Sequence, residues 1–165
     1  MTQQEYENKI KELQDELEQL KAAKIEAEQL KCWKPNKDEL YWTIISDGCV
    51  DCICWYNDGD DKWRRLTGNC FKTKEEAEEY KNQIEYTARY KNYIEEHSEP
   101  LDWENDEQYK YFAGFIFDEG YGINVNFVVT RKDQGVIYAS RREIIWDAIK
   151  EIGEDNFKKY VLGVK

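Results

Sequence analysis

The sequence has no long hydrophobic run. Nowhere does it approach the roughly eighteen consecutive apolar residues that a membrane-spanning helix requires. The opening residues, Met1 to Glu5, carry neither the basic nor the apolar region of a secretory signal peptide. We therefore expect a cytoplasmic protein that does not associate with membranes.

Residues and motifs that commonly carry catalysis are also scarce. The chain has no GxSxG, Walker, GxGxxG or HExxH motif, so no enzyme class is indicated. His97 is the only histidine, and its acidic neighbours Glu95 and Glu96 are typical of a surface connector. The adjacent Ser98 is a poor partner for it, because neighbouring residues seldom present a nucleophile and a base to each other. We expect a protein without enzymatic activity.

The five cysteines are an odd number in a chain without an export signal, so we expect free thiols rather than disulfides. Cys49, Cys52 and Cys54 suggest a zinc motif, but in a strand Cys49 faces one side and the other two face the opposite side. A zinc site would need a tight turn there instead. The run Asn57 to Asp61 lacks the ligand spacing of an EF-hand and is interpreted as a solvated turn. No metal or cofactor is predicted.

Acidic residues outnumber basic ones, and the formal net charge is -11 with 36% of the residues charged. Aromatic residues still make up 15% of the chain, which a disordered acidic tail would lack, so we expect a folded protein. The negative charge disfavours direct binding to nucleic acid and favours partners with a basic surface, such as the groove of a nucleic-acid enzyme. The alternative is that the acidity only keeps the protein soluble.

Residues 3–31 contain no glycine or proline and are predicted to form one helix, so that residues 1–33 make up an N-terminal coiled-coil region. Its apolar residues follow the four-three spacing of a coiled-coil seam as far as Leu20, and the stripe resumes at Ala23, Ala27 and Leu30 after a three-residue step. Such a stripe needs a cover, either from a second copy or from the body of the same chain. We favour a homodimer with these residues at its interface: Tyr6, Ile10, Leu13, Leu17 and Leu20.

Residues 34–165 are predicted to form one α+β domain built of two similar halves, at about 40–94 and 108–162. A short linker with proline, residues 34–38, separates this domain from the N-terminal helix. Each half contains a hairpin, a further short strand and a helix. We expect the two short sheets to pack together or to join into one antiparallel sheet backed by both helices.

The two halves share their local signals. Turns at Asp47-Gly48 and at residues 118–120 predict hairpins, with the second hairpin formed by strands at 111–117 and 123–129. Capping boxes at residues 73–76 and 140–143 are related by an offset of 67, which favours an internal duplication. The first helix is predicted to turn Ala77, Tyr80, Ile84 and Ala88 inward, and the second helix, which ends at Gly153, is predicted to bury Ile144, Ile145, Ala148, Ile149 and Ile152.

The most unusual stretch lies between the halves. Residues 92–109, here called the acidic segment, contain no lysine or arginine. Such a run can imitate a row of phosphates in a basic groove, and an aromatic residue within it adds contact energy. The alternative is an acidic, solvated connector. The residues predicted to bind a partner are Glu95, Glu96, Glu99, Asp102, Trp103, Glu104, Asp106 and Glu107.

Three blocks of the chain carry a resemblance: residues 41–44 (Tyr-Trp-Thr-Ile), residues 68–78 (Gly-Asn-Cys-Phe-Lys-Thr-Lys-Glu-Glu-Ala-Glu) and residues 152–160 (Ile-Gly-Glu-Asp-Asn-Phe-Lys-Lys-Tyr). They resemble those of small prophage proteins of Gram-positive bacteria, which often carry a coiled-coil helix ahead of a similar body. The resemblance covers about residues 40–165 and rests on caps and turns. It implies a fold and a phage origin rather than any catalytic residue.

Small acidic phage proteins of this kind include anti-CRISPR inhibitors that occupy the nucleic-acid sites of Cas nucleases. The resemblance therefore implies a non-enzymatic binding protein in the host bacterial cytosol, with a Cas nuclease or its guide-RNA complex as partner. The alternative is a coiled-coil dimeric structural or assembly protein of a phage, without an inhibitory role.

Overall fold

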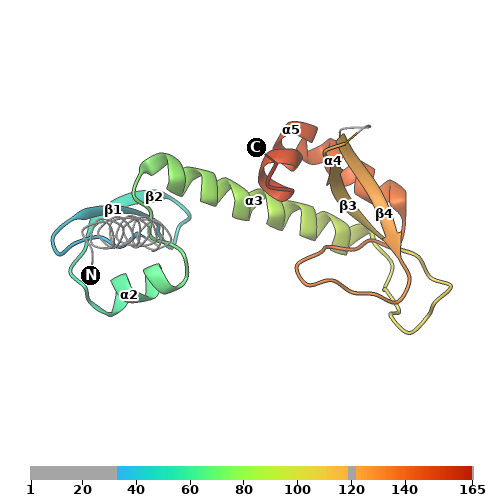
Figure 1. Ribbon diagram of the computed structural model, residues 1–165, viewed down its shortest axis with the longest axis horizontal. Coiled ribbons are helices and arrows are strands. Elements are labelled where there is room, and N and C mark those ends of the chain that lie inside the picture. Colours follow the sequence, from blue (N-terminus) through green and yellow to red (C-terminus); the bar gives the residue numbers. More distant parts are fainter. Residues whose placement is uncertain (1–32, 119–121, 165) are drawn as a thin grey trace, which may run out of the picture.

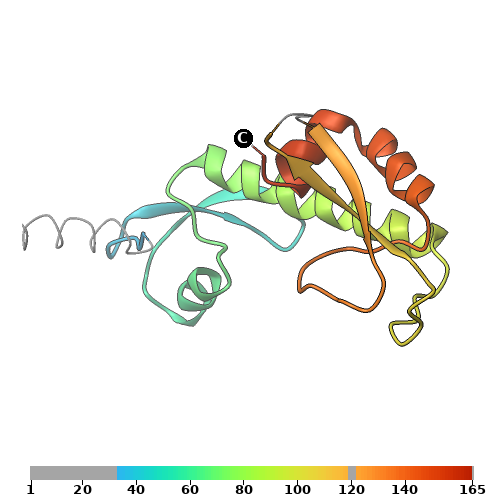
Figure 2. The same ribbon diagram turned by 45° about the vertical axis from the view of Figure 1, so that its right-hand side comes forward.

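The computed structural model describes residues 33–118 and 122–164, and the predicted helix at residues 3–31 with its five seam positions lies outside them. The described chain is α+β and forms two lobes at the two ends of one long helix, α3 (Lys74–His97) (Figure 1). Figure 2 shows the same separation from another side. No helix of the described residues is both long and apolar enough to span a bilayer.

The first lobe contains a two-stranded hairpin. Strands β1 (Leu40–Ile44) and β2 (Val50–Cys54) pair in antiparallel fashion. The turn between them closes with a 2.9 Å hydrogen bond from the Gly48 N–H to the Ile45 carbonyl, and Gly48 has a φ of 81°. Glycine favours this left-handed conformation because it has no Cβ to clash. The predicted Asp-Gly turn is confirmed.

A second element of this lobe occupies the run that the sequence presents as a solvated turn. Asp58 caps the start of helix α2 (Gly59–Leu66): its carboxylate accepts a 2.9 Å hydrogen bond from the Asp61 N–H. The interpretation as a turn is wrong here. A helix of two turns is too short to show a clear apolar period, although the Asp58-x-x-Asp61 spacing is close to that of a capping box.

Helix α3 begins where the sequence predicts. The Thr73 side chain accepts a hydrogen bond from the Glu76 N–H at 3.2 Å, and the Glu76 carboxylate accepts one from the Thr73 N–H at 3.3 Å. This reciprocal pair satisfies two backbone N–H groups at the helix start that have no partner within the helix. The first capping box is therefore confirmed.

Thr73→Ala tests the contribution of this cap. We expect the free energy of unfolding to fall by about 1 kcal/mol, because the Glu76 N–H loses its partner while the helix remains. Urea denaturation followed by circular dichroism measures the change. The control is Thr130→Ala, since Thr130 is exposed and lies outside every helix and strand. An equal loss in both variants would contradict the assigned role of the cap.

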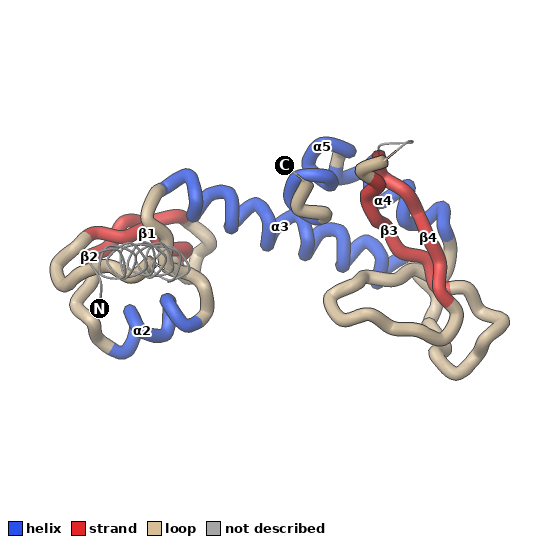
Figure 3. Tube along the Cα trace, in the orientation of Figure 1, coloured by secondary structure: helices blue, strands red, loops and turns tan. Residues whose placement is uncertain are grey.

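The apolar stripe of α3 is covered differently from the prediction. Ala77 is buried as expected, but Ile84 is 51% exposed and Ala88 is also exposed. In the middle of the helix, the side that carries Tyr86 is covered instead. The Tyr86 ring stacks on the Tyr160 ring, with 5.0 Å between the ring centres. The prediction fails here because the middle of α3 crosses between the lobes (Figure 3). Ile84 lines an open pocket beside Ile44 of the first hairpin and is only partly covered by it, while the C-terminal segment packs on α3 at Tyr86.

The second lobe packs a hairpin and the C-terminal helices around the far half of α3. Its two strands lie within one residue of their predicted positions, and all five predicted inward residues of the helix after Ser140 are buried. Gly153 ends that helix with a φ of 89°. The elements are β3 (Lys110–Ile116), β4 (Gly122–Val128), α4 (Arg142–Ile152), α5 (Glu154–Asn156) and the π-helix η1 (Phe157–Val161).

The two hairpins neither join nor pack on each other. Each is a separate two-stranded sheet, and the two sheets lie at opposite ends of α3 (Figure 1). The predicted common sheet is therefore wrong. The reason is α3 itself: its 24 residues span about 36 Å at the usual rise of an α-helix, and this length holds the lobes apart.

The lobes nevertheless share one plan. In each, the first strand exchanges two backbone hydrogen bonds with a residue just before a helix: Trp42 with Phe71, both at 2.9 Å, and Tyr111 with Ala139, at 2.9 and 2.8 Å. In place of a full third strand, each lobe has this one bridge. Phe71 corresponds to Ala139 at an offset of 68 (139 − 71), one more than the offset that the sequence suggests.

The second predicted capping box is not formed. The residue before α4 is Arg141, and no side chain caps that helix start. The Ser140 hydroxyl instead accepts a 3.0 Å hydrogen bond from the Glu99 N–H, and the Ser140 N–H donates to the Ser98 hydroxyl at 2.8 Å. Ser140 therefore ties the start of α4 to the end of α3, a contact that no local pattern reveals.

Candidate interaction surface

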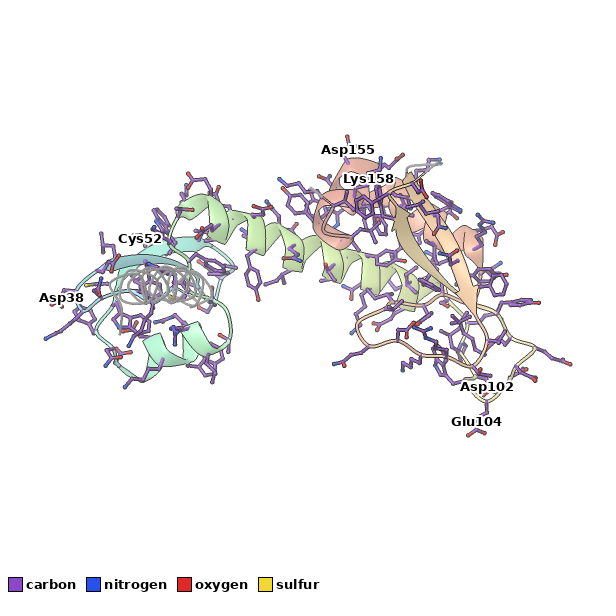
Figure 4. All side chains as sticks on the ribbon, viewed as in Figure 1. Asp38, Cys52, Asp102, Glu104, Asp155 and Lys158 are labelled. Carbon is purple, nitrogen blue, oxygen red and sulfur yellow. The ribbon has the colours of Figure 1, made fainter. Side chains whose placement is uncertain are left out.

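The acidic segment forms the end of α3 and the connection from α3 to β3. Residues 98–109 of this connection project as a loop from the second lobe (Figures 1 and 2). Asp102 and Glu104 lie at its far tip, and Glu104 points away from the protein (Figure 4). The predicted acidic contact residues are all exposed: Glu95, Glu96, Glu99, Asp102, Glu104, Asp106 and Glu107.

Hydrogen bonds within the loop define its shape. The Asp102 N–H donates to the Gln108 side-chain oxygen at 2.7 Å, and the Gln108 amide donates to the Pro100 carbonyl at 3.2 Å. The Asp102 carboxylate accepts a 3.0 Å bond from the Glu104 N–H, which tightens the tip. Asp102 is thus part of the loop's framework as well as part of its charge.

A buried lysine anchors the base of the loop. Lys110, the first residue of β3, is 0% exposed, and its ammonium group donates to the carbonyls of Asn105 at 2.7 Å and Val129 at 2.6 Å. A buried ammonium group is costly unless it is hydrogen-bonded, so these bonds hold the loop against the end of β4. The acidic loop is therefore attached to the sheet at a defined place.

Trp103 packs against the second lobe. Its ring meets the Tyr138 ring edge-on at 5.0 Å, and the ammonium groups of Lys110 and Lys132 lie 5.7 and 5.3 Å from its centre. The side chain is half-buried. These contacts give Trp103 a role in positioning the loop. Its contact with a partner stays a prediction.

The carboxylates of the acidic segment are largely free of basic neighbours. Lys91 and Glu95 form an ion pair of 3.6 Å, but both side chains are more than half exposed, and exposed pairs contribute little. The other six acidic residues form no ion pair with a basic residue of the described chain. Lys110 and Lys132 lie over the Trp103 ring instead. The loop therefore presents uncompensated negative charge to solvent.

His97 and Ser98 do not form a catalytic pair. The His97 Nδ1 atom lies 2.8 Å from the Tyr93 carbonyl, and its ring stacks on the Tyr93 ring at 4.1 Å. The Ser98 hydroxyl is occupied by the Ser140 N–H and donates to the Glu99 carbonyl at 3.3 Å. Both residues thus serve the junction between α3 and the loop.

The cysteines of the described chain are free thiols: Cys49, Cys52, Cys54 and Cys70. Within residues 33–118 and 122–164, no group of three or more histidine, cysteine or carboxylate side chains could hold a metal ion. Burial raises the pKa of the Cys70 thiol to about 11, so it is protonated at neutral pH. A protonated thiol is a poor nucleophile and a poor metal ligand.

Asp61 is a buried polar residue that no local sequence pattern indicates, as is Lys110. Asp61, in the run interpreted as a solvated turn, is 2% exposed. Its carboxylate accepts hydrogen bonds from the Tyr41 hydroxyl at 2.8 Å and from the Tyr56 N–H at 2.7 Å, and it lies 3.8 Å from the Arg64 guanidinium. This network joins β1 to the first turn of α2. Its role is structural, since it lies inside the first lobe.

The environment lowers the pKa of Asp61 and raises the pKa of Tyr41. Burial by itself would raise the pKa of Asp61, but the hydrogen bonds from Tyr41 and Tyr56 outweigh it and lower the pKa. Burial, together with the hydrogen bond to Asp61, raises the pKa of Tyr41 to about 12. Asp61 is therefore ionised and Tyr41 is protonated at neutral pH.

Comparisons of the chain with protein-family models, with curated proteins and with solved structures find no significant match.

Proposed function

We propose that this protein is a non-enzymatic binding protein that docks its acidic loop on the basic surface of a nucleic-acid enzyme. The observation that carries the proposal is the loop at residues 98–109. It projects from the body, is braced by Lys110 and Trp103, and exposes carboxylates that form no ion pair with the basic residues of the described chain. Such a surface imitates the charge of a phosphate backbone.

A braced loop suits this function better than a mobile one. Binding orders the groups at an interface, and a loop whose shape is already defined loses less freedom on docking. Unpaired carboxylates also draw a basic partner at long range and accelerate association. Both properties are expected of an inhibitor that competes with nucleic acid for a groove.

A guide-loaded Cas nuclease is the partner that we propose. The support is the resemblance of residues 40–165 to small prophage proteins, together with the acidic net charge of -11. The groove that holds an RNA–DNA heteroduplex in such an enzyme is strongly basic and reads the backbone rather than the sequence. An acidic surface of suitable shape can occupy it without any base-specific contact.

Charge neutralisation in the loop tests the proposal. The variant carries Glu96→Gln, Glu99→Gln, Glu104→Gln and Asp106→Asn, and it retains Asp102 and Trp103, which shape the loop. We expect inhibition of target-DNA cleavage by guide-loaded Cas nucleases to weaken by about tenfold or more, because each lost charge removes attraction to the groove. The unmodified protein should itself inhibit less well at higher salt.

The matched control neutralises the same number of exposed acidic residues away from the loop: Glu79→Gln, Glu85→Gln, Glu151→Gln and Asp155→Asn. It makes the net charge less negative by the same amount but leaves the loop intact, so inhibition should be nearly unchanged. If the control weakened inhibition as much as the loop variant, overall charge would be the cause. If the unmodified protein inhibited no nuclease of the panel, the proposed partner class would be wrong.

A further inference from the structure

Helix α2 turns its apolar residues towards solvent. Trp63 is 63% exposed and Leu66 is 85% exposed, whereas the acidic Asp61 on the same helix is 2% exposed. The usual arrangement is seen in α4, where the isoleucines and the alanine are buried. In α2 the order is inverted, and the residues that the structure describes leave the Trp63 and Leu66 side of the helix exposed.

The Asp61 network causes this inversion. The bond from the Tyr41 hydroxyl holds the Asp61 side of α2 against β1. At 100° per residue, Trp63 and Leu66 lie on the opposite side of the helix, three residues apart and therefore next to each other. Rotating α2 to bury them would expose Asp61 and break its hydrogen bonds. The face is a fixed feature of the first lobe.

The chain enters the described structure beside the start of α2. The Asp38 N–H donates to the Trp55 carbonyl at 2.9 Å, and the Lys34 ammonium group lies 5.8 Å from the centre of the Trp55 ring. Tyr56 follows Trp55 in the chain, and its N–H bonds to Asp61 in the first turn of α2. Residues 34–38, and with them the point where residues 1–32 join the described chain, therefore lie close to this turn.

We propose that the exposed face of α2 is the docking site of this chain's own N-terminal segment, through the stripe Ala23, Ala27 and Leu30. The side chains are complementary in size, because two small alanines leave room for the large Trp63 ring. The proposal also explains the step in the coiled-coil seam after Leu20. In this arrangement Ala23, Ala27 and Leu30 cover α2, and the earlier seam, from Tyr6 to Leu20, is left to bind another partner.

Chain direction and charge both select an antiparallel arrangement. The segment must run towards Trp33, whose neighbours lie at the start of α2, so its end meets the beginning of α2. In that orientation the exposed Asp60, beside the apolar face, lies on the same flank as Lys31. Lys62, on the other flank, lies on the side of Glu26. The opposite orientation would bring charges of like sign together.

The test measures solvent access to Trp63 in the full chain by hydroxyl-radical footprinting with mass spectrometry. Trp146, which is 40% exposed on α4, is the internal reference. If the segment covers α2, Trp63 is oxidised more slowly than Trp146, the reverse of their order in the described structure. In Ala27→Glu, which places a charge against the Trp63 ring, we expect the order to invert and Trp63 to become the faster.

The matched control is Gln29→Glu, which adds the same charge on the side of the segment away from the stripe. It should keep the slow oxidation of Trp63. Faster oxidation of Trp63 than of Trp146 in the unmodified chain would overturn the proposal, as would equal effects of the two substitutions. Protection of Trp63 that disappears on dilution would overturn it too, because a second copy would then be the occupant.

Discussion

Asp61→Ala is expected to lower the free energy of unfolding by about 2 to 6 kcal/mol, because it removes the acceptor of two hydrogen-bond donors, each of which costs about 1 to 3 kcal/mol when left unsatisfied. The substitution leaves the Tyr41 hydroxyl and the Tyr56 N–H without their acceptor inside the first lobe. It also leaves the Arg64 guanidinium without its nearest carboxylate. Urea denaturation at neutral pH, followed by circular dichroism, gives the difference directly.

The control for this loss is Asp60→Ala, one residue earlier on the same helix. Asp60 is exposed, so its favourable charge in the first turn of α2 and its attraction to Arg64 are screened by solvent, and we expect a change below about 1 kcal/mol. Similar losses in the two variants would show that α2 needs acidic residues in general. The buried network would then not be the reason for its stability.

The same network predicts how stability depends on pH. The folded protein holds the pKa of Asp61 below its ordinary value of 3.8, so the ionised carboxylate stabilises the fold at every pH above about 4. As the pH falls through that value, the unfolded chain takes up a proton that the folded chain resists. The stability advantage of the unmodified protein over Asp61→Asn should therefore shrink as the pH falls below about 4.

Phe157→Ala is expected to cost about 3 to 5 kcal/mol, which is the usual range for removing a fully buried aromatic side chain. Phe157 is 0% exposed, and its ring meets the Tyr90 ring of α3 edge-on at 5.0 Å. It belongs to the core that joins α3, α4 and β4. Thermal unfolding followed by circular dichroism should show a transition lowered by about 10 °C.

Phe127→Ala is the matched control, because Phe127 lies on β4 of the same lobe but is 57% exposed. It removes the same atoms from a position where most of them already contact water, so we expect a loss below about 1.5 kcal/mol. If the two variants had the same unfolding temperature, the core assigned to the second lobe would be wrong.

The two proposals concern opposite ends of the molecule. The face of α2 belongs to the first lobe, and the acidic loop projects from the second lobe, with α3 between them (Figure 1). Ala27→Glu should therefore leave nuclease inhibition unchanged, and the loop variant should leave the oxidation of Trp63 unchanged. Sites this far apart with no shared contacts are expected to behave independently.

Several elements could be predicted from the sequence because the information is local. Both hairpins follow from alternating residues and turns, and the start of α3 follows from the Thr73 cap. The buried side of α4 follows from its period of 3.6 residues, and Gly153 marks its end. In each case neighbouring residues alone decide the energy of the backbone conformation.

The tertiary structure decided what depends on distant partners. A helical period predicts an apolar stripe, but it does not say where other elements will cover that stripe. Ile84 is therefore exposed, while the Tyr86 ring packs against Tyr160 of η1. A capping spacing gives a candidate, but Ser140 bonds to Ser98 and Glu99 instead. Asp61 can be buried because the Tyr41 hydroxyl, twenty residues earlier, and the Tyr56 N–H donate hydrogen bonds to its carboxylate.

The acidic segment shows the same division. Its charge follows from the sequence alone, since no lysine or arginine occurs between Lys91 and Lys110. Its form as a braced loop depends on the buried Lys110 and on the packing of Trp103 against Tyr138, both of which are contacts with the second hairpin or its connection to α4. Composition determines the charge of a surface, and only packing between distant residues determines where that charge is presented.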